Sequence, residues 1–157
     1  MKKIISILLA ITFCSVLAIA QSDRGKSELS LGGGKVSLDY GRPAIKGRTI
    51  EALPVGSEWR MGANDATTLT TDVSLKFGDK TIQKGTYVLK AKRADDKNWV
   101  LMIQSEDQKT TVETPLTFAK VEPAVELLTI DLKKNGNGGK FVLQWGVFTL
   151  STDFKKA

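Results

Sequence analysis

The sequence predicts an all-β domain, and three observations carry that prediction. Short segments alternate apolar and polar residues, Gly-rich turns separate them, and no window of about ten residues shows a helical stripe. We expect an antiparallel two-sheet β-sandwich of the jelly-roll or immunoglobulin-like kind, with a closed β-barrel as the alternative. Residues 21–157 have the usual size of a single domain.

Each expected strand follows from its own residues. Apolar side chains recur at every second position, as in a strand with one buried face, in residues 36–40, 73–77, 87–91, 116–118, 128–132 and 141–145. Residues 99–104 are apolar on both faces, which predicts a central strand. Gly78-Asp79 and the Asn-Gly-Asn-Gly-Gly run at 135–139 predict turns. The apolar phase shifts after Gly146, which predicts a β-bulge there.

Residues 1–20 are typical of a secretory signal peptide. Two lysines precede an apolar stretch that is too short to span a bilayer, and Ala18-Ile19-Ala20 supplies a cleavage pattern. We therefore expect an exported protein, periplasmic or extracellular, that is cut after Ala20 and keeps no transmembrane segment. An uncleaved anchor is the alternative, and Cys14 could be acylated, although the bulky Phe13 before it argues against a lipobox.

Composition narrows the possible chemistry. The chain has no histidine and one cysteine, Cys14, which cleavage after Ala20 would remove. Catalytic triads with histidine, thiol nucleophiles and thiolate metal sites are then excluded. Cleavage would remove Lys2 and Lys3 and lower the net charge from +6 to +4, which is too moderate to indicate nucleic-acid binding. We expect no cofactor, no metal and no catalytic residue, and the sequence gives no oligomeric state.

Residues 41–66 break the strand pattern. They could form a short helical turn at 50–53 before Pro54, but nothing longer. Unstructured connections of this length are uncommon in compact domains and are usually functional or disordered. Because the segment contains Ile50, Trp59 and Met61, which tend to be buried, we expect an ordered, packed loop.

Two long motifs at this loop resemble a known family. They are VSLDYGRPAIKGR at 36–48 and EWRMGANDATT at 58–68, and they are accompanied by KGTY at 84–87 and by Trp99. Over residues 27–154 the chain resembles the domain-of-unknown-function 2911 family. The resemblance implies an exported bacterial protein and transfers no functional residue. Val55 and Met61 depart from the family pattern, which could alter the specificity of the loop.

The loop is the expected ligand-binding site. Its arginines could grip an anionic group and its aromatic residues could stack on a sugar. The ligand-binding residues of this hypothesis are Tyr40, Arg42, Lys46, Arg48, Trp59, Arg60, Asn64, Asp65 and Thr67. The alternative is that the loop closes one end of the fold, with Trp59 as a plug and an arginine over its ring. A rigid loop could do both.

Three functions stay open from the sequence. The first is a non-catalytic module that binds a glycan or another cell-envelope component. The second is a structural or assembly protein of the periplasm or cell surface. The third is a histidine-free hydrolase that uses Asp39, Glu58 or Asp65. The acidic pairs at 95–96 and 106–107 are interpreted as solvated turns.

Overall fold

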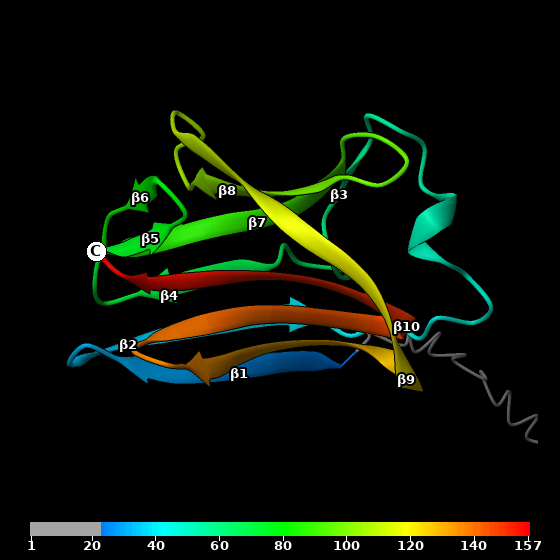
Figure 1. Cartoon of the computed structure of the whole chain (residues 1–157), viewed down its shortest axis with the longest axis horizontal. Helices are drawn as coiled ribbons and strands as arrows, with labels where there is room; N and C mark the ends of the chain where they lie inside the picture. The colour runs from blue at the N-terminus through cyan, green and yellow to red at the C-terminus, as the bar shows by residue number, and fades with distance from the viewer. Residues whose placement is uncertain (1–22) are drawn as a thin grey trace, which may run out of the picture.

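Ten β-strands and one short 3-10 helix make up residues 23–157, the part of the chain that the computed structural model describes (Figure 1). The elements are β1 (Arg24–Leu31), β2 (Gly34–Gly41), η1 (Ile50–Ala52), β3 (Glu58–Trp59), β4 (Thr68–Thr71), β5 (Leu75–Phe77), β6 (Lys80–Ile82), β7 (Gly85–Arg93), β8 (Trp99–Ser105), β9 (Thr111–Asn135) and β10 (Gly138–Lys156). The all-β prediction is confirmed. The expected signal peptide lies outside the described residues.

The strands form one continuous antiparallel path. Its order is β1-β2-β4-β7-β8-β9-β10-β5-β6, and β3 pairs with β7 beside this path. β8 pairs with β7 on one side and β9 on the other, which confirms its predicted central position. Within residues 23–157 the path does not close on itself, so the barrel alternative is wrong. Because the hydrogen-bonded path is continuous, a division into two separate sheets stays a prediction.

The long β9–β10 hairpin is bent over on itself. Gly146 has a φ of 62°, and the pairing register shifts on both sides of it. Residues 138–144 of β10 pair with 129–135 of β9, and residues 148–151 pair with 117–120. In Figure 1 both strands turn back at the right-hand end, and β10 then returns to the C-terminus at the left. We call this bend, residues 121–127 and 145–147, the crease; it confirms the predicted bulge at Gly146.

The core lies between the layers that this bend brings together. Leu38 of β2, Leu101 of β8 and Leu143 of β10 are each at most 2% exposed. The alternation predicted for residues 36–40 is confirmed, because Val36, Leu38 and Tyr40 are all buried. Burial of these side chains drives the strands to pack face to face.

The predicted turns are also present. Gly78 has a φ of 58° in the β5–β6 hairpin, and Gly136 has a φ of 56° between β9 and β10. The short helical turn is η1, where the Thr49 side chain accepts a hydrogen bond from the Glu51 amide. Within residues 23–157 no helix is long and apolar enough to cross a membrane.

Candidate functional site

The loop between β2 and β4 is pinned to the crease. The Ile45 amide donates to the Glu126 carbonyl at 2.8 Å, and the Leu128 amide donates to the Pro43 carbonyl at 3.0 Å. The Lys46 amide donates to the Glu126 side chain at 3.1 Å. These bonds give partners to backbone groups that have no regular ladder. The prediction of an ordered loop is therefore confirmed.

Trp145 is the centre of this contact. Its indole Nε1 donates to the Pro43 carbonyl at 3.0 Å, and the residue is 6% exposed. The Trp59 ring stacks on it at 5.7 Å between centroids and 13° between planes. The Arg48 guanidinium carbon lies 5.1 Å from the Trp145 ring centroid. The structure thus brings together two predicted site residues, Arg48 and Trp59, around Trp145, whose place in an alternating strand indicated a core residue.

Each of the three predicted arginines donates to a backbone carbonyl. Arg42 donates from Nε to the Leu128 carbonyl at 3.2 Å, and Arg48 donates from Nη2 to the Ala44 carbonyl at 2.8 Å. Arg60 donates from Nη1 to the carbonyl of residue 64 at 3.1 Å. Each guanidinium therefore satisfies loop or crease backbone. Arginines bonded to backbone carbonyls are expected if the loop closes one end of the fold.

The remaining predicted residues divide into buried and exposed sets. Tyr40 is 3% exposed, and Thr67 is fully buried and donates from Oγ1 to the Met61 carbonyl at 3.0 Å. Lys46, Arg60, Asn64 and Asp65 are exposed, and Trp59 is half-buried. The side chains that could meet a ligand are therefore the exposed set together with the accessible part of Trp59.

Arg24 was missed by the sequence reasoning. It pairs with Asp39 through Nε at 2.8 Å and also through Nη2. It donates from Nη1 to the Asp65 carbonyl at 3.2 Å, so it joins β1 and β2 to the end of the loop. A single arginine at the start of a strand carries no signal for this role.

Arg93 is the second missed residue. Its Nη1 donates to the carbonyls of Glu51 and Leu53, each at 2.6 Å, which fixes η1 against β7. Its side chain is only 15% exposed. Charge-assisted bonds of this kind are among the stronger hydrogen bonds in proteins. Two arginines outside the motif thus hold the middle of the loop and its end before β4.

The carboxylates of the hydrolase hypothesis are held by different partners. Asp39 pairs with Arg24, and Glu58 pairs with Lys90 at 3.1 Å. Asp65 is exposed, and its carbonyl, not its carboxylate, receives the Arg24 bond. This arrangement gives no support for two of these carboxylates acting on one substrate.

The acidic pairs fall in turns, as expected. Hydrogen bonds from the Asn98 side chain and from the Lys97 and Asn98 amides hold the pKa of Asp95 below its usual value. A bond from the Ser105 hydroxyl has the same effect on the pKa of Asp107. In residues 23–157 no three acidic, histidine or cysteine side chains gather as metal ligands. These aspartates therefore stabilise turns.

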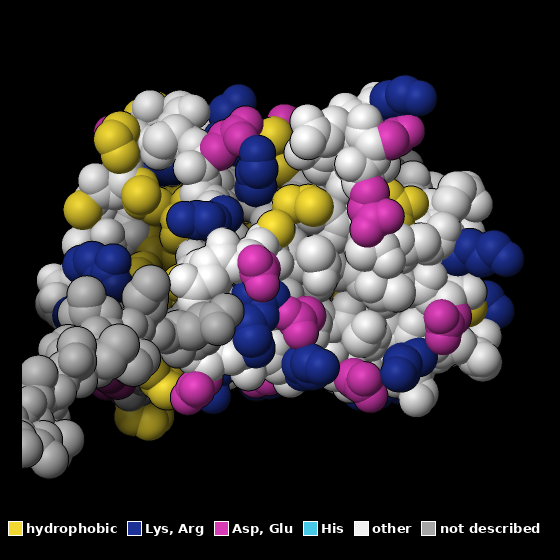
Figure 2. Space-filling view, turned by 180° about the vertical axis from the view of Figure 1, so that it is seen from behind, with side chains coloured by type: hydrophobic (Ala, Val, Ile, Leu, Met, Phe, Trp, Pro, Cys, Tyr) yellow, Lys and Arg dark blue, Asp and Glu magenta, His cyan; other side chains and the backbone are white. Residues whose placement is uncertain are grey.

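Apolar side chains are exposed at this same end. In the described part of the chain, the exposed large hydrophobic residues are Val55 at 53%, Leu127 at 38% and Val121 at 37%. Val55 is in the loop, and the other two are in the crease. Figure 2 shows apolar side chains gathered at this end, at the left of the view, with lysines and arginines beside them. The end of the fold closed by the loop is thus both apolar and basic.

Fold and loop together define a class: an antiparallel β domain whose bent hairpin is closed by an ordered, arginine-rich loop. Residues 22–154 match the family described as "Protein of unknown function (DUF2911)". The chain belongs to this family, which confirms the resemblance of its two motifs. Neither a curated protein nor a solved structure matches the chain.

Proposed function

We propose that the protein is exported and acts as a non-catalytic module that binds a glycan of the cell envelope. The ligand contacts the end of the fold where the loop meets the crease. Export rests on the signal-peptide pattern of residues 1–20. The choice of a glycan rests on the compartment and on the residue types at this end.

One observation carries the binding site: exposed apolar and basic side chains gather on a rigid loop. Val55 and Leu127 are exposed, Trp59 is half-buried, and Lys46 and Arg60 are exposed. Partly exposed aromatic rings stack on sugar faces, and cations bind the carboxylates that envelope glycans carry. We assign Lys46 and Arg60 to the ligand because both are exposed and Arg60 bonds to the loop through Nη1, to the carbonyl of residue 64. Arg48 lies over the Trp145 ring and donates to the Ala44 and Ile45 carbonyls.

The position of the apolar residues also separates the two non-catalytic functions. An assembly protein would be favoured by a large apolar patch away from the loop. The exposed large hydrophobic residues of the described chain lie in the loop and the crease. They therefore favour a ligand site at the loop over a separate assembly surface.

Export is tested by sequencing the N-terminus of the protein recovered from fractionated cells. We expect the mature chain to begin at Gln21 and to be found outside the cytoplasm. Recovery of the uncut chain in the cytoplasm would contradict export.

Binding is tested by titrating the protein with soluble muramidase fragments of peptidoglycan and following tryptophan fluorescence. Lys46→Ala and Arg60→Ala should each weaken binding about tenfold, because each removes one charge-assisted contact. The thermal midpoint of Lys46→Ala should stay close to the parent, since exposed charges contribute little to stability. Arg60→Ala also loses the exposed bond to the carbonyl of residue 64, so its midpoint should fall slightly. Lys84→Ala, an exposed lysine in the turn before β7, is the matched control and should bind normally. Equal affinity of all three variants would rule out the loop as the site.

A further inference from the structure

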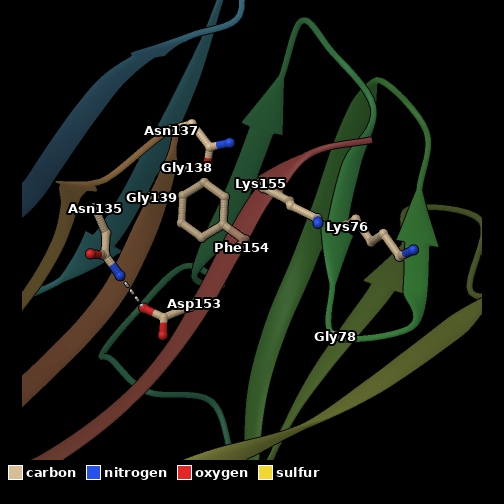
Figure 3. A pocket seen from close by; sticks show the side chains of 9 residues that line it. All are labelled: Lys76, Gly78, Asn135, Asn137, Gly138, Gly139, Asp153, Phe154 and Lys155. Carbon is tan, nitrogen blue, oxygen red and sulfur yellow. Dashed lines mark hydrogen bonds between the residues drawn. The ribbon is translucent and has the colours of Figure 1, made fainter.

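A second, polar pocket lies at the other end of the molecule from the loop. It has a volume of about 350 Å³ and forms where three segments meet: the β9–β10 turn, the start of the β5–β6 hairpin and the end of β10. Figure 3 shows side chains of these three segments around it, and Figure 1 places them near the C-terminus. The volume falls within the range of small-molecule sites. The bend of the hairpin creates this pocket, because it returns the β9–β10 turn to the end of β10.

Two lysines occupy neighbouring strands on one side of the pocket. Lys76 of β5 and Lys155 of β10 are direct cross-strand partners, and both line the pocket. Side chains at directly opposed positions are close neighbours on one face of a sheet, and like charges there are destabilising. Within residues 23–157 neither ammonium group forms an ion pair. An anionic group between them would relieve this repulsion.

The opposite side of the pocket offers neutral hydrogen-bonding groups and an acceptor. The Asn135 side chain donates from Nδ2 to the Asp153 carboxylate at 2.9 Å, which fixes both groups at the rim (Figure 3). Asn137 lines the same rim. An amide and a carboxylate held in this way suit hydroxyl groups, which both donate and accept. A simple anion without hydroxyl groups would form no hydrogen bonds with the Asp153 carboxylate on this side of the pocket.

Gly138 and Gly139 line the pocket where the β9–β10 turn packs against the end of β10. A Cβ at Gly138 would overlap the Phe154 carbonyl oxygen, and a Cβ at Gly139 would overlap the Phe154 ring. The turn can approach β10 this closely only because these two positions lack side chains. The pocket is therefore a fixed product of the fold.

We infer that this pocket binds an acidic sugar. Its carboxylate lies between Lys76 and Lys155, and its hydroxyl groups bond to Asn135 and Asp153. The site is separate from the loop surface of the proposed function and stands without it.

The inference is tested by nuclear magnetic resonance titration of the purified protein with D-glucuronate, D-glucose and acetate. Glucuronate should shift the Gly138 and Lys76 amides and the Asn135 side-chain amide, and should bind about tenfold more tightly than glucose or acetate. Lys76→Gln and Lys155→Gln should each weaken glucuronate about tenfold. Both variants should keep the native spectrum, because each removes a repulsion and leaves the core unchanged.

The controls separate the possible failures. Lys133→Gln changes an exposed lysine of β9 that does not line the pocket, so it should bind as the parent does. Lys46→Ala and Arg60→Ala lie at the other end and should leave these shifts unchanged. If acetate binds as tightly as glucuronate, the sugar ring is not recognised and that part of the inference is wrong. If glucose binds as tightly, the lysine pair does not hold the carboxylate. Absence of shifts at the pocket would overturn the site itself.

Discussion

Gly41→Ala is expected to lower the free energy of unfolding by about 3 kcal/mol or more, a large part of a typical total stability. Gly41 ends β2 and packs against the backbone of residue 63 in the loop. A Cβ there would overlap the Ala63 carbonyl oxygen and lie 2.8 Å from the Ala63 nitrogen. These are backbone atoms, so no side chain can rotate away and the loop itself must move. Urea unfolding followed by circular dichroism measures the loss.

Gly33→Ala is the matched control for this steric argument. Gly33 lies in the β1–β2 turn with a φ of 84°, and a Cβ there would meet no atom within 4 Å. Its cost is conformational only, about 1–2 kcal/mol. If Gly41→Ala costs no more than Gly33→Ala, the close approach of residues 41 and 63 is wrong. Ala63→Gly in the Gly41→Ala background should restore little, because the overlap is with backbone.

The strands that could be predicted are those in which apolar and polar residues alternate along the strand itself. β2, β7 and β8 alternate buried and less buried residues, and that pattern depends only on neighbouring positions. β4 has a single large apolar residue, Leu69, between threonines; Thr71 of β4 is itself buried, and so is Thr67 just before the strand. A threonine-rich segment of this kind shows no alternation of apolar and polar residues, so the sequence does not indicate which of its faces is buried. β1 was missed for a similar reason, since only Leu29 and Leu31 are large and apolar.

The crease could be predicted only in part. A change of apolar phase at Gly146 is visible in the sequence, and it correctly indicates a bulge. The reversal of the whole hairpin is not visible, because it depends on contacts between residues far apart, such as Trp145 with Pro43. Alternation gives the face of a strand but not the direction in which a long strand bends.

The sequence shows the residue types of the loop, but it does not predict which groups its side chains contact. Three arginines and a tryptophan suggest an anionic ligand, but a loop without ladder partners also needs donors for its own carbonyls. The structure uses Arg42 and Arg48 in this second way. Guanidinium groups suit either role equally well, so residue type alone cannot decide between them.

Trp145→Ala is expected to cost about 3–5 kcal/mol of unfolding free energy, as large-to-small changes of buried aromatic residues do. The change removes a ring that stacks on Trp59 and lies beside Arg48, and it leaves the Pro43 carbonyl without its indole donor. The loss should be greatest at the crease. Amide hydrogen exchange should therefore show Ile45 and Leu128, which donate across the contact between loop and crease, losing protection before the β7–β8 ladder does.

Trp145→Phe separates the ring from its hydrogen bond. Phenylalanine keeps an aromatic surface against Trp59 but cannot donate to the Pro43 carbonyl, which still accepts from the Leu128 amide. Its cost should therefore be that of one lost hydrogen bond, about 0.5–1.5 kcal/mol. If the Ala and Phe variants unfold at the same urea concentration, the aromatic stack contributes nothing to stability and the loss in both comes from the indole hydrogen bond. A larger loss in the Ala variant would show that the Arg48, Trp59 and Trp145 contacts close the bent hairpin. The loop would then be a structural part of the fold, and its exposed Lys46 and Arg60 would be carried on a rigid support.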